Sequence, residues 1–322
     1  MCQIDNSTIL VTVKTLVYNQ APYLRQCLDG IINQKTNFCF EVIVHDDCSS
    51  DGSVDIIREY AEKYPNIIKP IFEIENQYSK VGFSGIDKIM DAYINGKYIA
   101  FCEGDDYWTD MLKLQKQVDF LESHDDYGLV YTQFQVYNQQ NDSFAPGWCK
   151  ETTLEKEFGG NDIMTLTVCL RTSLYFKYQN QIKPQKEWKM GDMPLWIFLL
   201  SQSRAYFMPD VMCTYRVIQG TASHPKSLEG LVDFRENAYH VLLYLANCLN
   251  LQHLLPRVTV NYLISMYILM ISNDFFQDIK DKFLIRKYKI LNLKILLLYI
   301  IVRNSLLRRI IRKKYHFSSI SK

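Results

Sequence analysis

The chain lacks the cysteine spacing that disulfide-rich and zinc-binding proteins show. Its nine cysteines are odd in number and scattered over 322 residues, and no two follow a Cys-x-x-Cys pattern. Neither a disulfide framework nor a zinc site is indicated, and a reducing, cytoplasmic compartment fits this cysteine usage best. Residues 1–7 also lack a basic region followed by an apolar run, so the sequence predicts no secretory signal.

Acidic residues are missing from the C-terminal part of the chain. From Lys282 to Lys322 there are 12 Lys or Arg and no Asp or Glu, whereas the other 281 residues hold 24 basic and 35 acidic side chains. The net charge of +1 therefore hides an acidic body and a basic tail, which we expect to face different partners. The longest uncharged stretch of the tail, residues 295–302, is far below the ~20 residues that cross a bilayer.

The first 130 residues alternate strand-like and helical patterns. At 48% hydrophobic residues the chain can bury a sizeable core. The expected strands and helices are, in chain order, residues 9–13, 22–31, 40–44, 53–64, 71–74, 86–93, 98–102 and 109–121. Thr109 is the expected N-cap of the last helix. This alternation predicts an α/β fold with a mostly parallel central sheet flanked by helices, because parallel strands need helical crossovers.

The pattern changes twice further along the chain. Beyond residue 130 it weakens into aromatic-rich strand or loop sequence, and from Leu231 onward long apolar helical patterns dominate. We therefore expect a first domain over residues 1–225, made of halves 1–110 and 111–225, followed by a helical C-terminal extension over residues 226–322.

Acidic loops follow two of the expected strands. One is HDDCSSDGS, with Asp46 and Asp47, and the other is AFCEGDDYW, with Glu103, Asp105 and Asp106. Parallel strands gather such loops at one sheet edge, where ligands bind. Each loop could simply cap the next helix, and a place for Asp106 near a helix N-terminus fits that alternative. Three crowded acids, however, repel one another unless a cation compensates, so a Mg²⁺ or Mn²⁺ site that binds a diphosphate is the sharper hypothesis.

Three segments in order carry a resemblance to a known family. LVYNQAPYL, FEVIVHDDCSSDGS and YIAFCEGDDYW together resemble the inverting glycosyltransferase family 2, whose catalytic domain has the GT-A fold. The similarity covers about residues 8–225 and is closest to bacterial members that build capsular, O-antigen or related surface polysaccharides. The two halves of the first domain would then bind the donor nucleotide and the acceptor.

The resemblance implies roles for particular residues. Asp46 would contact the nucleotide base, and the Tyr18-Asn19 loop would line its pocket. The Asp-x-Asp element of the family corresponds to Glu103-Gly104-Asp105, which puts Glu103 near the ribose and Asp105 on a divalent metal, Mn²⁺ or Mg²⁺. Supporting residues would be Asp47, Asp106 and Arg216.

A general base is expected on the acceptor side of the reacting carbon. The segment KEWKMGDMPLWIFLLS resembles a later acidic motif of the family, in which Asp192 would be that base. Asp192 could equally cap the helix that begins before Pro194, and the two roles are compatible. In MCTYRVIQGTASH, Arg216 could pair with phosphate or form a structural ion pair, and Ile218 occupies a position where many members have a His. His224 is only a distant substitute.

The tail, residues 285–317, mixes apolar and basic residues. A helix lying in the membrane interface, with Lys and Arg toward anionic headgroups, would suit a lipid-linked acceptor. The alternatives are a core-packing helix with a basic end and a nucleic-acid contact. We expect the first, and thus a protein at the inner face of the cell membrane that binds no nucleic acid.

These observations predict a metal-dependent, inverting hexosyltransferase. Its expected donor substrate is a nucleoside-diphosphate sugar, with a UDP-sugar as the first choice. A sugar nucleotidyltransferase would also use acids and metal, but the loop at residues 15–20 has no Gly, Lys or Arg for a phosphate loop. A receiver-like signalling domain would need acids after the first strand, where Lys14-Thr15 stands.

Overall fold

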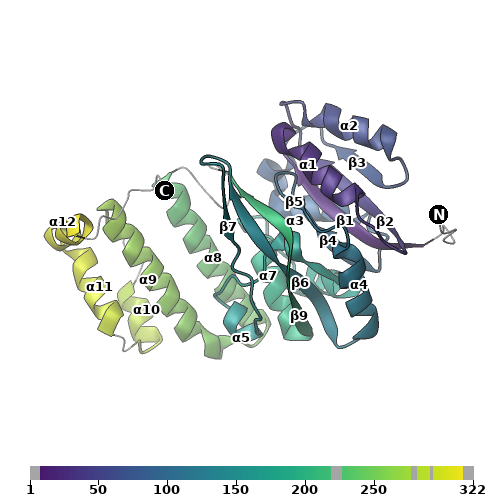
Figure 1. The fold of residues 1–322 in the computed structure, drawn as a ribbon. Coiled ribbons are helices and arrows are strands. Elements are labelled where there is room, and N and C mark those ends of the chain that lie inside the picture. The colour runs from purple at the N-terminus through teal and green to yellow at the C-terminus, as the bar shows by residue number, and fades with distance from the viewer. Residues whose placement is uncertain (1–7, 219–226, 277–280, 291–292, 315–322) are drawn as a thin grey trace. The chain divides into compact units, whose positions relative to one another are not determined.

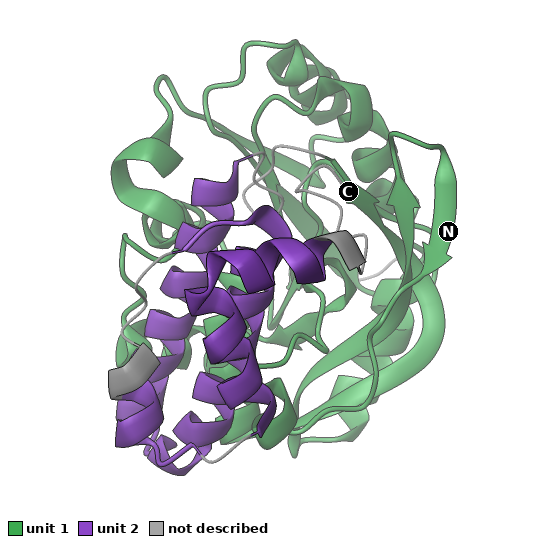
Figure 2. Cartoon of the chain, turned by 90° about the vertical axis from the view of Figure 1, so that its left-hand side faces the viewer, with its two compact units in different colours: residues 1–218 green, residues 219–322 purple. Residues whose placement is uncertain are grey.

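The structure is a computed structural model that describes residues 8–218, 227–276, 281–290 and 293–314. The chain divides into two units, residues 1–218 and 219–322 (Figure 2). The expectations for residues 1–7, for His224 and for the last residues of the basic tail, 315–322, lie outside the described residues.

The first unit is an α/β domain around one nine-stranded sheet (Figure 1). Its helices and strands are β1 Ile9–Val17, α1 Ala21–Ile32, β2 Cys39–Asp46, α2 Ser53–Lys63, β3 Ile68–Phe72, α3 Gln77–Asp91, β4 Tyr98–Phe101, β5 Tyr107–Trp108, α4 Lys113–Ser123, β6 Tyr127–Asn138, β7 Ser143–Pro146, α5 Leu154–Glu157, β8 Cys169–Arg171, α6 Thr172–Ile182, α7 Asp192–Gln202 and β9 Arg204–Val217. A single 3₁₀ turn, Thr165–Thr167, precedes β8. The predicted α/β class is confirmed.

The sheet has a parallel half and a mixed half. Its strand order is β3-β2-β1-β4-β8-β6-β9-β5, with β7 beside β6. Strands β3, β2, β1 and β4 pair in parallel, as the alternating sequence pattern predicted. Beyond β4, β8 runs antiparallel to β4 and β6, while β6 and β9 are parallel to each other. The carboxyl ends of β1, β2 and β4 therefore point to one edge.

Burial explains why the parallel strands read as continuous apolar runs. Val11, Val13 and Val17 of β1 are fully buried, as are Val42 and Val44 of β2. Helices cover both faces of such a strand, so side chains on both sides lose contact with water. Helix α1 packs onto the sheet with four buried residues at helical spacing, Leu24, Cys27, Leu28 and Ile31.

Helix α3 is longer than the sequence predicted and is kinked. It begins at Gln77 because the Asn76 side chain accepts the Ser79 N–H at 2.8 Å. Gly82 inside it has φ 66°, and a Cβ there would lie 2.4 Å from the carbonyl oxygen of Lys186. Only glycine permits this approach to the segment that leads into α7. Strand β3 also begins earlier than expected, at Ile68 rather than Ile71.

The expected helix cap at Thr109 is wrong. Residues Tyr107–Trp108 form β5, and α4 begins only at Lys113. The Thr109 N–H donates instead to the Met212 carbonyl at 2.9 Å, so pairing with β9 overrides local capping. Asp106 consequently does not lie at the start of a helix.

The described residues of the second unit form helices and their connections. The helices are α8 Leu228–Cys248, α9 Leu255–Asn273, α10 Asp281–Lys287, α11 Leu293–Arg303 and α12 Ser305–Lys314. Among the described residues, one helical stretch, Gln252–Asn273, is long and apolar enough to cross a membrane, with a mean hydropathy of 1.5. Half of its most apolar window is buried inside the protein, and core helices meet the same criterion.

Candidate active site

Three carboxylates gather in the loop after β4. Glu103, Asp105 and Asp106, here called the acid loop, each offer one oxygen, and these oxygens lie within 4.8 Å of one another. The loop rests on the end of β1, because the Gly104 N–H donates to the Leu16 carbonyl at 3.1 Å. A Cβ on Gly104 would lie 2.4 Å from the Gln20 side-chain oxygen, so glycine lets the two loops approach closely.

Burial, with repulsion between neighbouring carboxylates, raises the pKa values of the acid loop. The Glu103 side chain keeps contact with solvent, but protein atoms surround its carboxylate. The loss of water around the carboxylate, and then the charges of Asp105 and Asp192, raise the pKa of Glu103 to about 8. Burial also raises the pKa of Asp105, and it raises that of buried Asp106 well above the ordinary range, with the two neighbouring carboxylates adding to the rise. Clustered carboxylate oxygens of this kind fit a hard divalent cation, which would relieve the repulsion.

Arg216 of β9 holds the acid loop in place. Its backbone N–H donates to Asp106 at 2.8 Å, and its Nε donates to the Asp105 carbonyl at 2.9 Å. The remaining guanidinium nitrogens donate to Gln139 and Gln26, both at 2.6 Å. The guanidinium also lies over three aromatic rings, those of Tyr23, Tyr107 and Tyr137. Arg216 is thus built into the loop rather than held toward solvent.

The residues expected at the nucleotide lie at the ends of β1 and β2. Asp46 is fully buried; one carboxylate oxygen accepts the Ser49 N–H at 2.9 Å, and Oδ2 has no hydrogen-bond partner among the described residues. Asn19 has φ 52°, and its N–H donates to the Ser49 hydroxyl. Tyr18 beside it is 51% exposed. A buried carboxylate oxygen without a donor is ready to accept one from a ligand.

Asp47 has a structural role. Its two carboxylate oxygens accept the backbone N–H groups of Gln77, at 2.6 Å, and Tyr78, at 3.0 Å. These groups belong to the first turn of α3, so Asp47 caps that helix and ties it to the end of β2.

Asp192 is the first residue of α7. Its Oδ1 accepts the N–H of Met193 at 2.7 Å, and its Oδ2 accepts the Thr165 hydroxyl at 3.0 Å. The charge of Asp192 adds, after burial and the charge of Asp105, to the rise in the pKa of Glu103. Gly191 is the N-cap of α7, so Asp192 lies in the first turn of the helix rather than at its cap, and its role as general base stays a prediction.

The sequence did not predict a role for two residues near Asp192. Thr165 supplies the hydroxyl just described, and Glu157 is a buried carboxylate whose Oε2 accepts the Asp162 N–H at 2.9 Å. Burial, then the charges of Asp162 and Asp192, raises the pKa of Glu157 to about 7. Both lie in the aromatic-rich region without a clear periodic pattern, where no sequence signal pointed to them.

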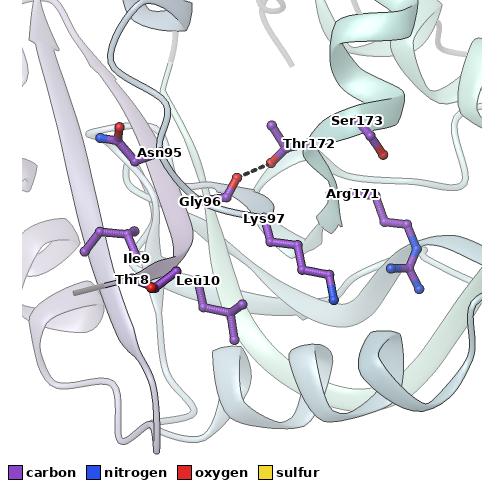
Figure 3. Close-up of a pocket in the computed structure, with 9 residues that line it drawn as sticks. All are labelled: Thr8, Ile9, Leu10, Asn95, Gly96, Lys97, Arg171, Thr172 and Ser173. Atoms are coloured by element: carbon purple, nitrogen blue, oxygen red, sulfur yellow. Dashed lines mark hydrogen bonds between the residues drawn. The ribbon is translucent and has the colours of Figure 1, made fainter. Parts of the chain in front are cut away.

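A cavity of about 450 Å³ is lined by none of these residues. Figure 3 shows the residues that line it. Thr8, Ile9 and Lys97 line it at the amino ends of β1 and β4, opposite the acid loop along β4. Its cations are engaged: Lys97 pairs with Glu122 at 2.8 Å, and Arg171 donates to backbone carbonyls of the 121–127 segment. We therefore assign the candidate active site to the acid loop.

The comparison with known families now decides the family. A family model described as Glycosyl transferase family 2 matches residues 12–186, more than half of the chain. The chain belongs to this family. The match includes β1, β2 and β4 with their loops, so it confirms the resemblance that the sequence segments carried.

Bacterial proteins are among the curated relatives of this glycosyltransferase family 2 chain. An uncharacterized protein of Mycobacterium tuberculosis is 36% identical over 165 residues, which cover 50% of this chain and 46% of that protein. The chain thus matches about half the length of this relative. A Bacillus subtilis protein provisionally named as the teichuronic acid biosynthesis glycosyltransferase TuaG is 26% identical over 220 residues, 67% of this chain and 82% of TuaG.

Solved structures share the fold. Staphylococcus aureus TarS 1–349 in complex with UDP-GlcNAc has a TM-score of 0.59 at 20% identity, covering 79% of this chain and 72% of TarS. The mannosyltransferase PcManGT of Pyrobaculum calidifontis, in complex with GDP-Man and Mn²⁺, has a TM-score of 0.52 at 17% identity and covers 94% and 87%. The predicted GT-A type of fold is confirmed by this likeness.

Proposed function

We propose that this chain is an inverting glycosyltransferase that moves one sugar from a nucleoside-diphosphate sugar to a hydroxyl of a glycan or lipid-linked glycan. The observation that carries the proposal is the acid loop at the carboxyl end of β4, whose three carboxylate oxygens lie within 4.8 Å of one another in the part of the chain that matches the family. The TuaG name supports a role in bacterial surface-polysaccharide synthesis, and the TarS complex supports a UDP-sugar as donor.

Asp192 is the proposed general base. The acceptor hydroxyl oxygen forms a bond to the anomeric carbon while the bond from that carbon to the diphosphate oxygen breaks, and its electron pair leaves with the diphosphate. The hydroxyl proton passes to the Asp192 carboxylate, which Thr165 and the Met193 N–H hold in one orientation. Attack opposite the leaving group inverts the anomeric configuration.

The acid loop would hold a divalent metal, Mn²⁺ or Mg²⁺. Asp105 is the proposed ligand, with Asp106 in support and Glu103 toward the ribose; their hard oxygens within 4.8 Å of one another suit either ion. When bound, such an ion stabilises negative charge on a departing diphosphate. Asp46, with its unpartnered Oδ2, would accept from the nucleotide base, and Tyr18 and Asn19 would line that pocket.

We further propose that the enzyme works on the cytoplasmic side of the cell membrane as a peripheral protein. Residues 282–322 hold 12 basic side chains and no acidic one. Anionic lipids would attract this segment. A lipid-linked acceptor would then be presented at the same surface.

A panel of nucleotide sugars with Mn²⁺ or Mg²⁺ tests the function. We expect one donor to raise the melting temperature and to be slowly hydrolysed with release of the nucleoside diphosphate. Asp192→Asn should keep the stabilisation by donor and lose at least about a hundredfold in turnover. Asp55→Asn, on the exposed side of α2, is the matched control and should behave as wild type. Pyrophosphate release from a nucleoside triphosphate would instead indicate a nucleotidyltransferase.

A further inference from the structure

Helices α11 and α12 of the second unit hold apolar side chains in solvent. These residues, here called the apolar stripe, are Leu293 at 73% exposure, Leu296 at 55%, Leu297 at 52%, Ile300 at 50%, Leu306 at 66% and Ile310 at 50%. Isolated exposed apolar side chains are common, but six within 18 residues call for a partner.

The four stripe residues on α11 lie along one face of that helix. They recur at positions i, i+3, i+4 and i+7 from Leu293, the spacing of one helix side. The other side of α11 packs on α9 and buries Ile295 and Val302. Apart from Lys294 and Arg303, α11 is apolar, while protein covers only one side of it, which is typical of a helix that meets lipid or another surface.

The charges around the stripe indicate the kind of partner. Basic residues interleave with it, and Arg303 follows Ile300 by less than one turn. Arg309, next to Ile310, has a side chain 71% exposed. Asp274 pairs with Arg308 and Arg309. An apolar face bordered by cations suits the interface of an anionic bilayer, where apolar groups enter the acyl boundary and cations meet headgroups.

We propose that the apolar stripe is the surface that docks on an anionic lipid bilayer, with α11 lying in the plane of the interface. This inference rests on the membrane location in the proposed function and names the residues responsible. A second copy of the chain is the rival occupant, but two such faces would bring like charges together, whereas anionic headgroups attract them. The long helix α9 would remain within the protein.

Co-sedimentation of the full chain with lipid vesicles tests the proposal. Vesicles of phosphatidylcholine alone are compared with vesicles of equal parts phosphatidylcholine and phosphatidylglycerol. We expect binding to the second kind, weaker at high salt. The variant Leu296→Gln/Leu297→Gln/Ile300→Gln should bind at least about tenfold more weakly, because it removes apolar groups and keeps every charge. Ile74→Gln is the matched control, an apolar residue 94% exposed in the first unit.

Each outcome has one meaning for the proposal. Equal vesicle binding by the triple variant and wild type overturns it. In a second outcome, light scattering shows an oligomer for the wild type and a monomer for the triple variant, and neither protein binds vesicles. This result assigns the stripe to a second copy of the chain instead. Donor hydrolysis is measured in parallel: hydrolysis without vesicle binding counts against the docking surface alone, and vesicle binding without hydrolysis of any donor counts against the proposed function alone.

Discussion

The Thr165 hydroxyl donates a 3.0 Å hydrogen bond to Oδ2 of Asp192, while the adjacent Met193 N–H binds Oδ1. The two donors come from different parts of the chain, the turn before β8 and the first turn of α7. Together they fix the orientation of a carboxylate that otherwise could rotate at the helix start.

Thr165→Val is predicted to lower turnover by about tenfold, which corresponds to one lost hydrogen bond to a charged group. The donor KM should stay unchanged, because Thr165 acts through Asp192. Thr165→Ser keeps the hydroxyl and should restore most of the activity. Equal kcat in the Val variant and wild type would show that Asp192 needs no second donor.

Adding Mn²⁺ should stabilise the protein through the acid loop. At a concentration about a hundred times the Kd, a ligand adds about 2.7 kcal/mol to the free energy of unfolding, visible as a higher melting temperature. Asp105→Asn should remove this gain. Asp55→Asn, an exposed acid of α2, should keep it. A gain that survives in Asp105→Asn would move the metal elsewhere.

Arg216→Gln is predicted to lower the free energy of unfolding by about 2–4 kcal/mol, because it breaks the buried contacts of the guanidinium with Asp105, Gln139 and Gln26. Urea unfolding measures this change. The control is Arg204→Gln, which removes a surface pair with Asp126 and should cost less than about 1 kcal/mol. Similar losses in both variants would contradict a special role for Arg216.

The acid loop should make the metal-free protein less stable as pH rises. The folded state raises the pKa of Glu103 from 4.5 to about 8, so between these values it holds a proton that the unfolded chain has released. This contribution to stability is complete below pH 4.5 and is lost as pH rises through 8. Chemical unfolding in EDTA across this range should show the decline, and Glu103→Gln should flatten it. A slope that Glu103→Gln leaves unchanged would assign the decline to other groups.

Much of the first unit was readable from local patterns. The alternation of apolar runs and amphipathic helices predicted β1, α1, β2 and α2, because each pattern matches the period of its element and the buried face it needs. The failure at Thr109 shows the limit of such reasoning. A Thr before an amphipathic run is a good local cap, but the strand pairing of β5 with β9 takes its N–H, and that contact spans more than 100 residues.

The sequence by itself determined the family and the candidate acids, because Asp46, Glu103, Asp105 and Asp106 stand in short motifs that follow strands directly. Only the tertiary structure showed how other residues support these acids. Asp47 caps α3, Arg216 holds the acid loop, and Thr165 orients Asp192. These roles depend on contacts between residues tens of positions apart or more, which no local pattern encodes. Likewise the basic composition of the tail was visible at once, but which face of α11 remains uncovered follows from its packing on α9.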